Sequence, residues 1–178
     1  MIRRTIPNTL SILRGASGFV FFAAITLDQW VLAFGVFVYA AISDLLDGPL
    51  ARRFKQANSL GTRIDHTADC IFVFLGLLAL SLHLKGAVPI VLPVVQLVAF
   101  VEYAAFKSIR QSSMLPSKLG RYNGIAYFVV IGATTTQMAL QINWIPFLWI
   151  YVLSWGLVVA TLLSLCMRIK DRLTDDRH

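Results

Sequence analysis

Charged residues are scarce in this chain, making up 14% of its 178 residues, whereas a soluble globular domain carries about 25%. Hydrophobic residues make up 57%, and the mean hydropathy is +0.71. Apolar segments of about 20 residues, long enough to cross a bilayer as a helix, recur along the whole chain. The composition therefore excludes a soluble protein and predicts an all-α polytopic membrane protein with one domain, residues 1–178.

Cysteine is also rare, and linkers, internal repeats and low-complexity segments are missing. The two cysteines, Cys70 and Cys166, both fall inside apolar segments, where a thiol behaves as a small hydrophobic group. Neither a disulfide framework nor a cysteine-based metal site follows from them. The first apolar segment contains Arg14 and has no convincing signal-peptide cleavage site, so we expect it to be retained.

The net charge of +7 does not indicate nucleic acid binding, because the basic residues lie between the apolar segments. Six helices are expected, at about 6–26, 30–54, 60–82, 87–108, 118–140 and 145–167. With six crossings, every Lys and Arg except Lys85 falls on the side of the two termini, which marks that side as cytoplasmic. We therefore expect a six-transmembrane-helix bundle with both termini in the cytoplasm, in the plasma (inner) membrane of a bacterium.

Four aspartates lie in the second and third predicted helices, namely Asp44, Asp47, Asp65 and Asp69. A charge at membrane depth costs several kcal/mol unless it is paired, solvated or bound to a metal, so these acids indicate a functional site. We expect the two helices to form an antiparallel hairpin on which the carboxylates face each other at matching depths, counted at about 1.5 Å per residue. Clustered carboxylates suit a hard cation such as Mg²⁺ or Mn²⁺, and such a site suits phosphoryl chemistry.

The same stretch has the pattern D-x2-D-G-x2-A-R-x8-G-x3-D-x3-D from Asp44 to Asp69, and it resembles the signature of the CDP-alcohol phosphatidyltransferases at every fixed position. The resemblance implies transfer of a phosphatidyl group from CDP-diacylglycerol to an alcohol with release of CMP, in phospholipid biosynthesis. It implies that the four aspartates form the metal site and that Asp69 is the general base. It assigns the CDP site to Asp44, Gly48, Ala51, Arg52 and Gly61.

The opening segment IPNTLSILR is similar to that of phosphatidylglycerophosphate synthases, which implies glycerol 3-phosphate as the acceptor. Those enzymes commonly have lysine where this chain has Cys70 and Asn123, so inositol phosphate, serine, choline and phosphatidylglycerol stay open as acceptors. Four basic residues on the same membrane side could hold an acceptor phosphate: Arg63, Arg110, Lys118 and Arg121.

Other interpretations of these residues also stay open. Interfacial basic residues often serve only to set topology, and Arg14 is interpreted as such an anchor. Glu102 could be a contact between helices or a wall of the acceptor site. His66 follows Asp65 directly, so it points away from the acid face and is interpreted as structural or solvated. The segment from Gly120 to Gly124 fits close helix packing as well as a functional role.

Two other functions compete with the enzyme. The acids could serve a cation or proton transporter, but they gather in the cytoplasmic half instead of spreading across the bilayer. The chain could also be a scaffold that has lost activity, although every motif position is present. The expected partners are CDP-diacylglycerol, a small polar alcohol and membrane lipids, and the chain could pair as a homodimer.

Overall fold

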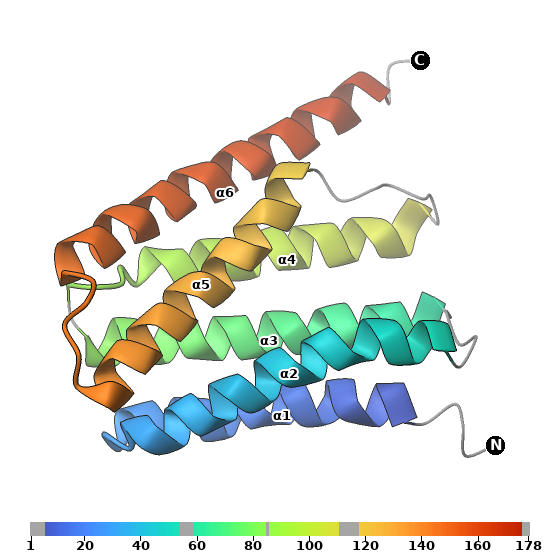
Figure 1. Cartoon of the computed structure of the whole chain (residues 1–178). Coiled ribbons are helices and arrows are strands. Elements are labelled where there is room, and N and C mark those ends of the chain that lie inside the picture. The colour runs from blue at the N-terminus through green and yellow to red at the C-terminus, as the bar shows by residue number, and fades with distance from the viewer. Residues whose placement is uncertain (1–5, 54–58, 85, 111–117, 176–178) are drawn as a thin grey trace.

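The computed structural model describes residues 6–53, 59–84, 86–110 and 118–175. Consecutive helices run in opposite directions, and the start of the first lies at the same end of the bundle as the end of the last (Figure 1). The prediction of an all-α fold is confirmed, with six helices in the described residues: α1 (Ile6–Thr26), α2 (Trp30–Arg53), α3 (Ser59–His83), α4 (Val91–Arg110), α5 (Lys118–Leu140) and α6 (Phe147–Asp175).

Most helix ends lie close to the predicted positions, with two differences. Helix α4 begins at Val91 and not near residue 87, because Pro89 cannot donate a backbone hydrogen bond and Pro93 is best tolerated in a first turn. Helix α6 continues to Asp175, well beyond the predicted end near Met167. Its charged final segment contains Arg and Lys, which are good helix formers, so helix persists after the apolar pattern stops.

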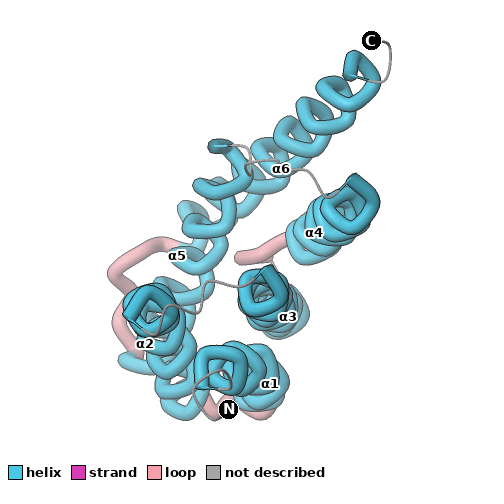
Figure 2. Tube along the Cα trace, turned by 90° about the vertical axis from the view of Figure 1, so that its right-hand side faces the viewer, coloured by secondary structure: helices cyan, strands magenta, loops and turns pink. Residues whose placement is uncertain are grey.

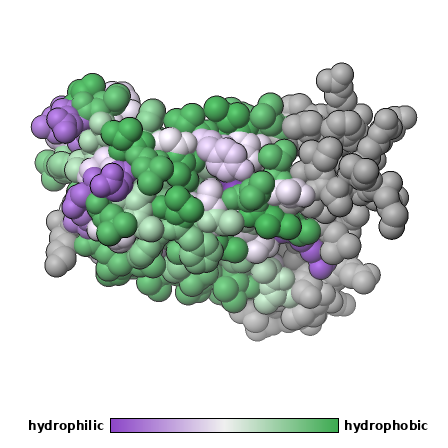
Figure 3. Space-filling view, turned by 90° about the horizontal axis from the view of Figure 1, so that it is seen from below, coloured by the Kyte–Doolittle hydropathy of each residue, from purple (hydrophilic) through white to green (hydrophobic). Residues whose placement is uncertain are grey.

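Within the described residues, three helices contain segments that are long and apolar enough to cross a membrane, at Thr9–Thr26, Arg63–His83 and Phe147–Lys170. Shorter apolar segments occupy Trp30–Leu46 and Val91–Ala105. Hydrophobic side chains cover much of the face seen in Figure 3. An apolar exterior over helices of this length is typical of a membrane protein.

Helix α1 packs against both α2 and α3, and in the described part of the chain α2 and α3 make no close backbone contact with each other. The end view in Figure 2 shows α1, α2 and α3 as the three corners of a triangle. The second and third helices therefore do not pack against each other through their backbones, and α1 connects them. Helix α1 approaches α3 closely at two glycines, which have no side chain in the way. A Cβ at Gly15 would lie only 3.3 Å from Cα of Ala68, and one at Gly18 only 3.1 Å from Cα of Phe72.

An aromatic core supports this arrangement. The ring of Phe72 on α3 is fully buried and stacks between Phe21 of α1 and Phe128 of α5, with centroid distances of 5.3 and 5.7 Å. Because Asp65, Asp69 and Phe72 are spaced i, i+4 and i+7, they lie on one face of α3. The two aspartates are therefore held directly above a rigid apolar layer.

The opposite end of the bundle carries an ion pair of its own. Asp28 adopts a positive φ of 57° in the turn between α1 and α2, and its Oδ1 lies 2.9 Å from Nε2 of His83 at the end of α3. The indole ring of Trp30 packs edge-on against the same imidazole, at a centroid distance of 5.3 Å.

Candidate metal centre

Three of the four predicted metal ligands come together in the structure. Asp44 extends from α2, and Asp65 and Asp69 extend from α3, with one carboxylate oxygen of each within 4.8 Å of the others. The exposed fractions of the three side chains are 52%, 38% and 31%. The cluster is therefore partly shielded and still open to a ligand.

A residue of α1 completes this cluster. The guanidinium of Arg14 is fully buried, with its Nε 2.7 Å from Oδ1 of Asp69 and its Nη1 3.3 Å from Oδ1 of Asp44. Its Nη2 forms an ion pair with Asp65, which also accepts a hydrogen bond of 3.1 Å from Oγ of Ser11. The planar fork of arginine can address several carboxylates at once. Arg14 thus joins α1 to both α2 and α3 at the level of the acids.

The interpretation of Arg14 as an interfacial anchor is wrong, because an anchor extends its charge to the headgroups and this guanidinium has no exposed surface. The sequence already indicates that Arg14 lies at the depth of the aspartates. Arg14 lies eight residues after the start of α1 at Ile6, which is about 12 Å along the helix. That depth is comparable to the depths of the aspartates in the second and third helices.

The three carboxylate oxygens of Asp44, Asp65 and Asp69 are suitable ligands for a hard divalent cation. Carboxylate oxygens are the ligands that Mg²⁺ and Mn²⁺ prefer, and the three oxygens lie close enough to share one ion after a small inward movement. With the carboxylates ionised, the single positive charge of Arg14 leaves the cluster with a net negative charge. A divalent cation would neutralise that excess charge.

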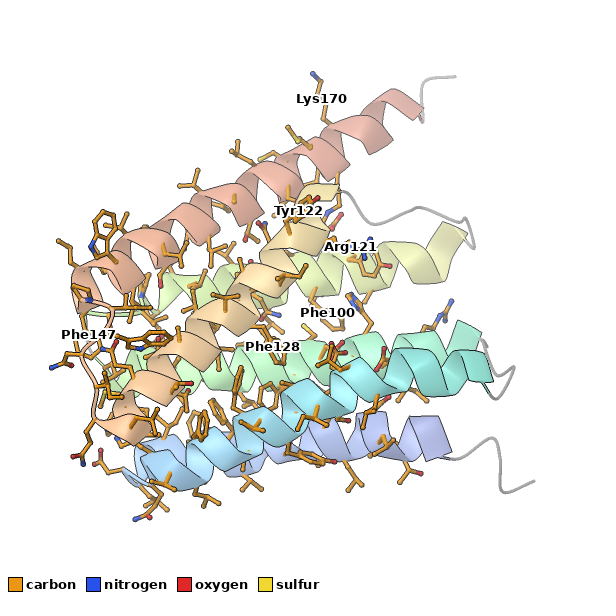
Figure 4. All side chains as sticks on the ribbon, viewed as in Figure 1. Phe100, Arg121, Tyr122, Phe128, Phe147 and Lys170 are labelled. Carbon is orange, nitrogen blue, oxygen red and sulfur yellow. The ribbon has the colours of Figure 1, made fainter. Side chains whose placement is uncertain are left out.

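The other predicted site residues are distributed over the same end of the bundle. Gly61, in the first turn of α3, is partly exposed, and Arg121 is exposed near the start of α5 (Figure 4). Arg63 is exposed too, but it lines a cavity between α3 and α4, separate from the aspartates. The side chains of the remaining six lie outside the described part of the structure, although their backbone belongs to α2, α4 or α5: Asp47, Gly48, Ala51, Arg52, Arg110 and Lys118.

The structure also decides three of the open interpretations. Glu102 is a contact between helices, because its Oε2 lies 3.2 Å from Nη2 of Arg168 on α6. His66 makes a structural contact, with its ring 5.1 Å from that of Tyr103 on α4, and its side chain is otherwise exposed. At Gly124 a Cβ would meet nothing within 4 Å, so this glycine does not mark a close helix contact.

Comparison with known proteins gives a consistent result. A family model described as CDP-alcohol phosphatidyltransferase matches residues 4–166. Human cardiolipin synthase (CMP-forming) is 32% identical over 130 residues, covering 69% of this chain and 41% of the human protein. The cardiolipin synthase (CMP-forming) of Streptomyces coelicolor is 38% identical over 85 residues, covering 43% of this chain and 39% of its own length.

A third relative carries a different name. The CDP-diacylglycerol–glycerol-3-phosphate 3-phosphatidyltransferase of Cereibacter sphaeroides is 30% identical over 138 residues, covering 71% of this chain and 61% of that protein. The chain thus spans about two fifths of the two cardiolipin synthases and about three fifths of this third relative. No solved structure matches the chain significantly.

Proposed function

Because this chain belongs to the CDP-alcohol phosphatidyltransferase family, we propose that it is a membrane enzyme that transfers the phosphatidyl group of CDP-diacylglycerol to the hydroxyl of an alcohol. The observation that carries the proposal is the convergence of Asp44, Asp65 and Asp69 on one partly open site. Release of CMP agrees with the names of the two cardiolipin synthases, which are described as CMP-forming.

We further propose that all six helices cross the membrane and that both termini face the cytoplasm. The distribution of Lys and Arg along the sequence supports this topology, as does the position of the start of α1 and the end of α6 at one end of the bundle (Figure 1). The aspartate cluster then lies in the cytoplasmic half of the bilayer, where a soluble nucleotide and a lipid can both reach it. A bacterial plasma membrane stays our prediction, and the relatives come from bacteria and eukaryotes.

The reaction makes one phosphorus–oxygen bond and breaks another. The oxygen of the acceptor hydroxyl attacks the phosphorus attached to diacylglycerol, and the bond from that phosphorus to CMP breaks. We assign the hydroxyl proton to the carboxylate of Asp69, acting as the general base. The electron pair of the broken bond leaves with CMP, so the phosphatidyl group is transferred without a change in oxidation state.

Asp44, Asp47, Asp65 and Asp69 would hold Mg²⁺ or Mn²⁺, which supplies charge stabilisation for a pyrophosphate and for its leaving group. Arg14 keeps the carboxylates close together from the α1 side through its three ion pairs. For the CDP group we propose contacts with Asp44, Gly48, Ala51, Arg52 and Gly61, as the family pattern implies.

Our preferred acceptor is glycerol 3-phosphate, which agrees with the name of the relative from Cereibacter sphaeroides. Arg110, Lys118 and Arg121 are the candidates for holding its phosphate, whereas Arg63 lines the separate cavity between α3 and α4. Phosphatidylglycerol is the second candidate, because its phosphatidylation would give cardiolipin, the product in the names of the other two relatives. Incubating the purified chain with labelled CDP-diacylglycerol and each acceptor in turn separates these two and also inositol phosphate, serine and choline.

The general reaction is tested with the wild-type chain, Asp69→Asn and Asp28→Asn in detergent or vesicles. We expect divalent-dependent release of CMP from wild type, a loss of at least a hundredfold in Asp69→Asn, as is typical when a general base is removed, and near-normal release in Asp28→Asn. Asp28 is the matched control because it lies in the ion pair at the opposite end of the bundle. Cation flux across vesicles without any turnover would instead favour a transporter.

A further inference from the structure

A small cavity of about 110 Å³ lies between α3 and α4. Arg63 and His66 line it from α3, and Phe100 and Tyr103 line it from α4; Figure 4 shows Phe100 between these helices. Cys70, one turn beyond His66, accepts a hydrogen bond of 3.0 Å from Nε2 of Gln96 on α4, which confirms that this face of α3 is turned toward α4. The cavity is therefore separate from the carboxylates, which meet Arg14 of α1.

The lining has the chemistry of an anion site. Arg63 is exposed, and its guanidinium can bind a phosphate through two parallel hydrogen bonds. The imidazole of His66 is held between two aromatic rings, 5.7 Å from Phe100 and 5.1 Å from Tyr103. Of the described residues that line the cavity, none is acidic, so the electrostatic environment favours a negatively charged group.

The position of the cavity along the helices matches the headgroup region of a bilayer. Arg63 is four residues from the start of α3 and is the first residue of its apolar span, about 6 Å along the helix. On α4, Leu97 and Val101 are exposed at 37% and 56%, and their spacing from Ala104 of the cavity places all three on one face of the helix. Apolar surface thus continues from the cavity toward the membrane interior, where acyl chains lie.

We propose that this cavity binds a phosphate ester, and that the apolar face below it favours the headgroup of an anionic lipid as the source. Arg63 carries the charge, His66 and Tyr103 line the cavity beside it, and Phe100 packs against the glycerol. A soluble phosphate ester offers the same group without acyl chains. Anionic lipids are enriched in the cytoplasmic leaflet, so the occupancy of this cavity would depend on how much anionic lipid the membrane contains.

The test measures binding and not turnover, so its outcome is independent of the proposed phosphatidyltransferase activity. The purified full chain in detergent is titrated with dioleoyl phosphatidic acid, which has a phosphate but no acceptor hydroxyl, with dioleoyl phosphatidylcholine, and with glycerol 3-phosphate. Native mass spectrometry reports the bound species. The variants are Arg63→Gln and Arg63→Lys, with Lys170→Gln as the control, because Lys170 is exposed on α6 and lies outside both the cavity and the proposed acceptor site.

We expect phosphatidic acid to bind wild type more tightly than phosphatidylcholine, and Arg63→Gln to weaken it about tenfold, the effect of one charge-assisted hydrogen bond. Arg63→Lys should retain part of the binding, and Lys170→Gln should retain all of it. Arg63-dependent binding of glycerol 3-phosphate alone would support the phosphate site and overturn the lipid as its source. Equal losses in Arg63→Gln and Lys170→Gln, or equal binding of the two lipids, would overturn the site itself. The Lys variant decides the question if the Gln variant does not fold.

Discussion

The ion pairs of Arg14 give the most direct test of the structure. Arg14→Met removes the guanidinium and keeps an unbranched side chain that can fill much of the same space. The variant leaves Asp44, Asp65 and Asp69 close together without the cation that the structure places among them. We expect it to destabilise the chain strongly when no divalent cation is present.

The expected loss of stability in Arg14→Met follows from the burial of the ion pairs. Removing one partner of a fully buried ion pair costs about 3–5 kcal/mol, and exposed pairs contribute far less. Arg14 is fully buried but its three partners are 31–52% exposed, so water can solvate the carboxylates in part and we expect a loss of about 2–4 kcal/mol. For a chain of 178 residues, this corresponds to a decrease in melting temperature of roughly 5–15 °C.

The assay is thermal unfolding of the purified chain in detergent with EDTA, for wild type, Arg14→Met, Arg14→Lys and Arg121→Met. Arg14→Lys keeps the positive charge but loses the planar guanidinium that addresses several carboxylates, so its melting temperature should lie between those of wild type and Arg14→Met. Arg121→Met removes an exposed arginine from the same end of the bundle and should change stability by about 0.5 kcal/mol or less.

A second arm repeats the unfolding with increasing Mn²⁺. A unit charge about 4 Å away contributes roughly 4 kcal/mol at an effective dielectric constant of 20, so removing Arg14 should strengthen cation binding by at least about tenfold even if the native side chain can partly move away. Because a ligand stabilises the state that binds it, Mn²⁺ should raise the melting temperature of Arg14→Met more than that of wild type. Equal melting temperatures of the two proteins in EDTA would refute the structural role of Arg14, and equal Mn²⁺ responses would refute its electrostatic coupling to the cation.

Three further predictions concern packing and the cation. A Cβ at Gly132 would lie 2.4 Å from Cζ of Phe37, so Gly132→Leu should lower the free energy of unfolding by about 1–3 kcal/mol through overpacking. A Cβ at Gly156 would meet nothing within 4 Å, so Gly156→Leu should have the melting temperature of wild type. Glu102→Gln should lower the melting temperature by removing the charge that faces Arg168, with a cost of about 1–3 kcal/mol. Chelation by EDTA should abolish CMP release, and added Mg²⁺ or Mn²⁺ should restore it.

The helices and the position of the acids could be predicted because they depend on local properties. Apolar length gives the number of helices, and the fixed rise per residue then places Asp44 and Asp69 at the same depth on either side of one turn. The start of α4 was less predictable, because Pro89 and Pro93 are both compatible with a first turn. The extension of α6 to Asp175 was missed because a charged segment after an apolar one is equally compatible with helix and with coil.

The position of Arg14 needed tertiary information. A basic residue near a helix end can extend to the headgroups or turn inward, and the choice depends on which helices flank it. Helix α1 packs against both α2 and α3, and Gly15 and Gly18 allow its backbone to approach that of α3 closely. In that place the guanidinium of Arg14 is fully buried, and the structure shows it paired with three carboxylates.

The same reasoning bears on the acceptor. The two positions that depart from phosphatidylglycerophosphate synthases are both buried here, Cys70 at 8% and Asn123 at 6% exposure. Cys70 accepts its hydrogen bond from Gln96, and Nδ2 of Asn123 donates one of 3.4 Å to Oγ1 of Thr161 on α6. Both side chains therefore join neighbouring helices, and a lysine at either position would bring a charge into a packed interface. If the chain binds an acceptor phosphate, that charge must come from other basic residues, and among those with described side chains Arg121 is exposed at the same end of the bundle as the aspartates.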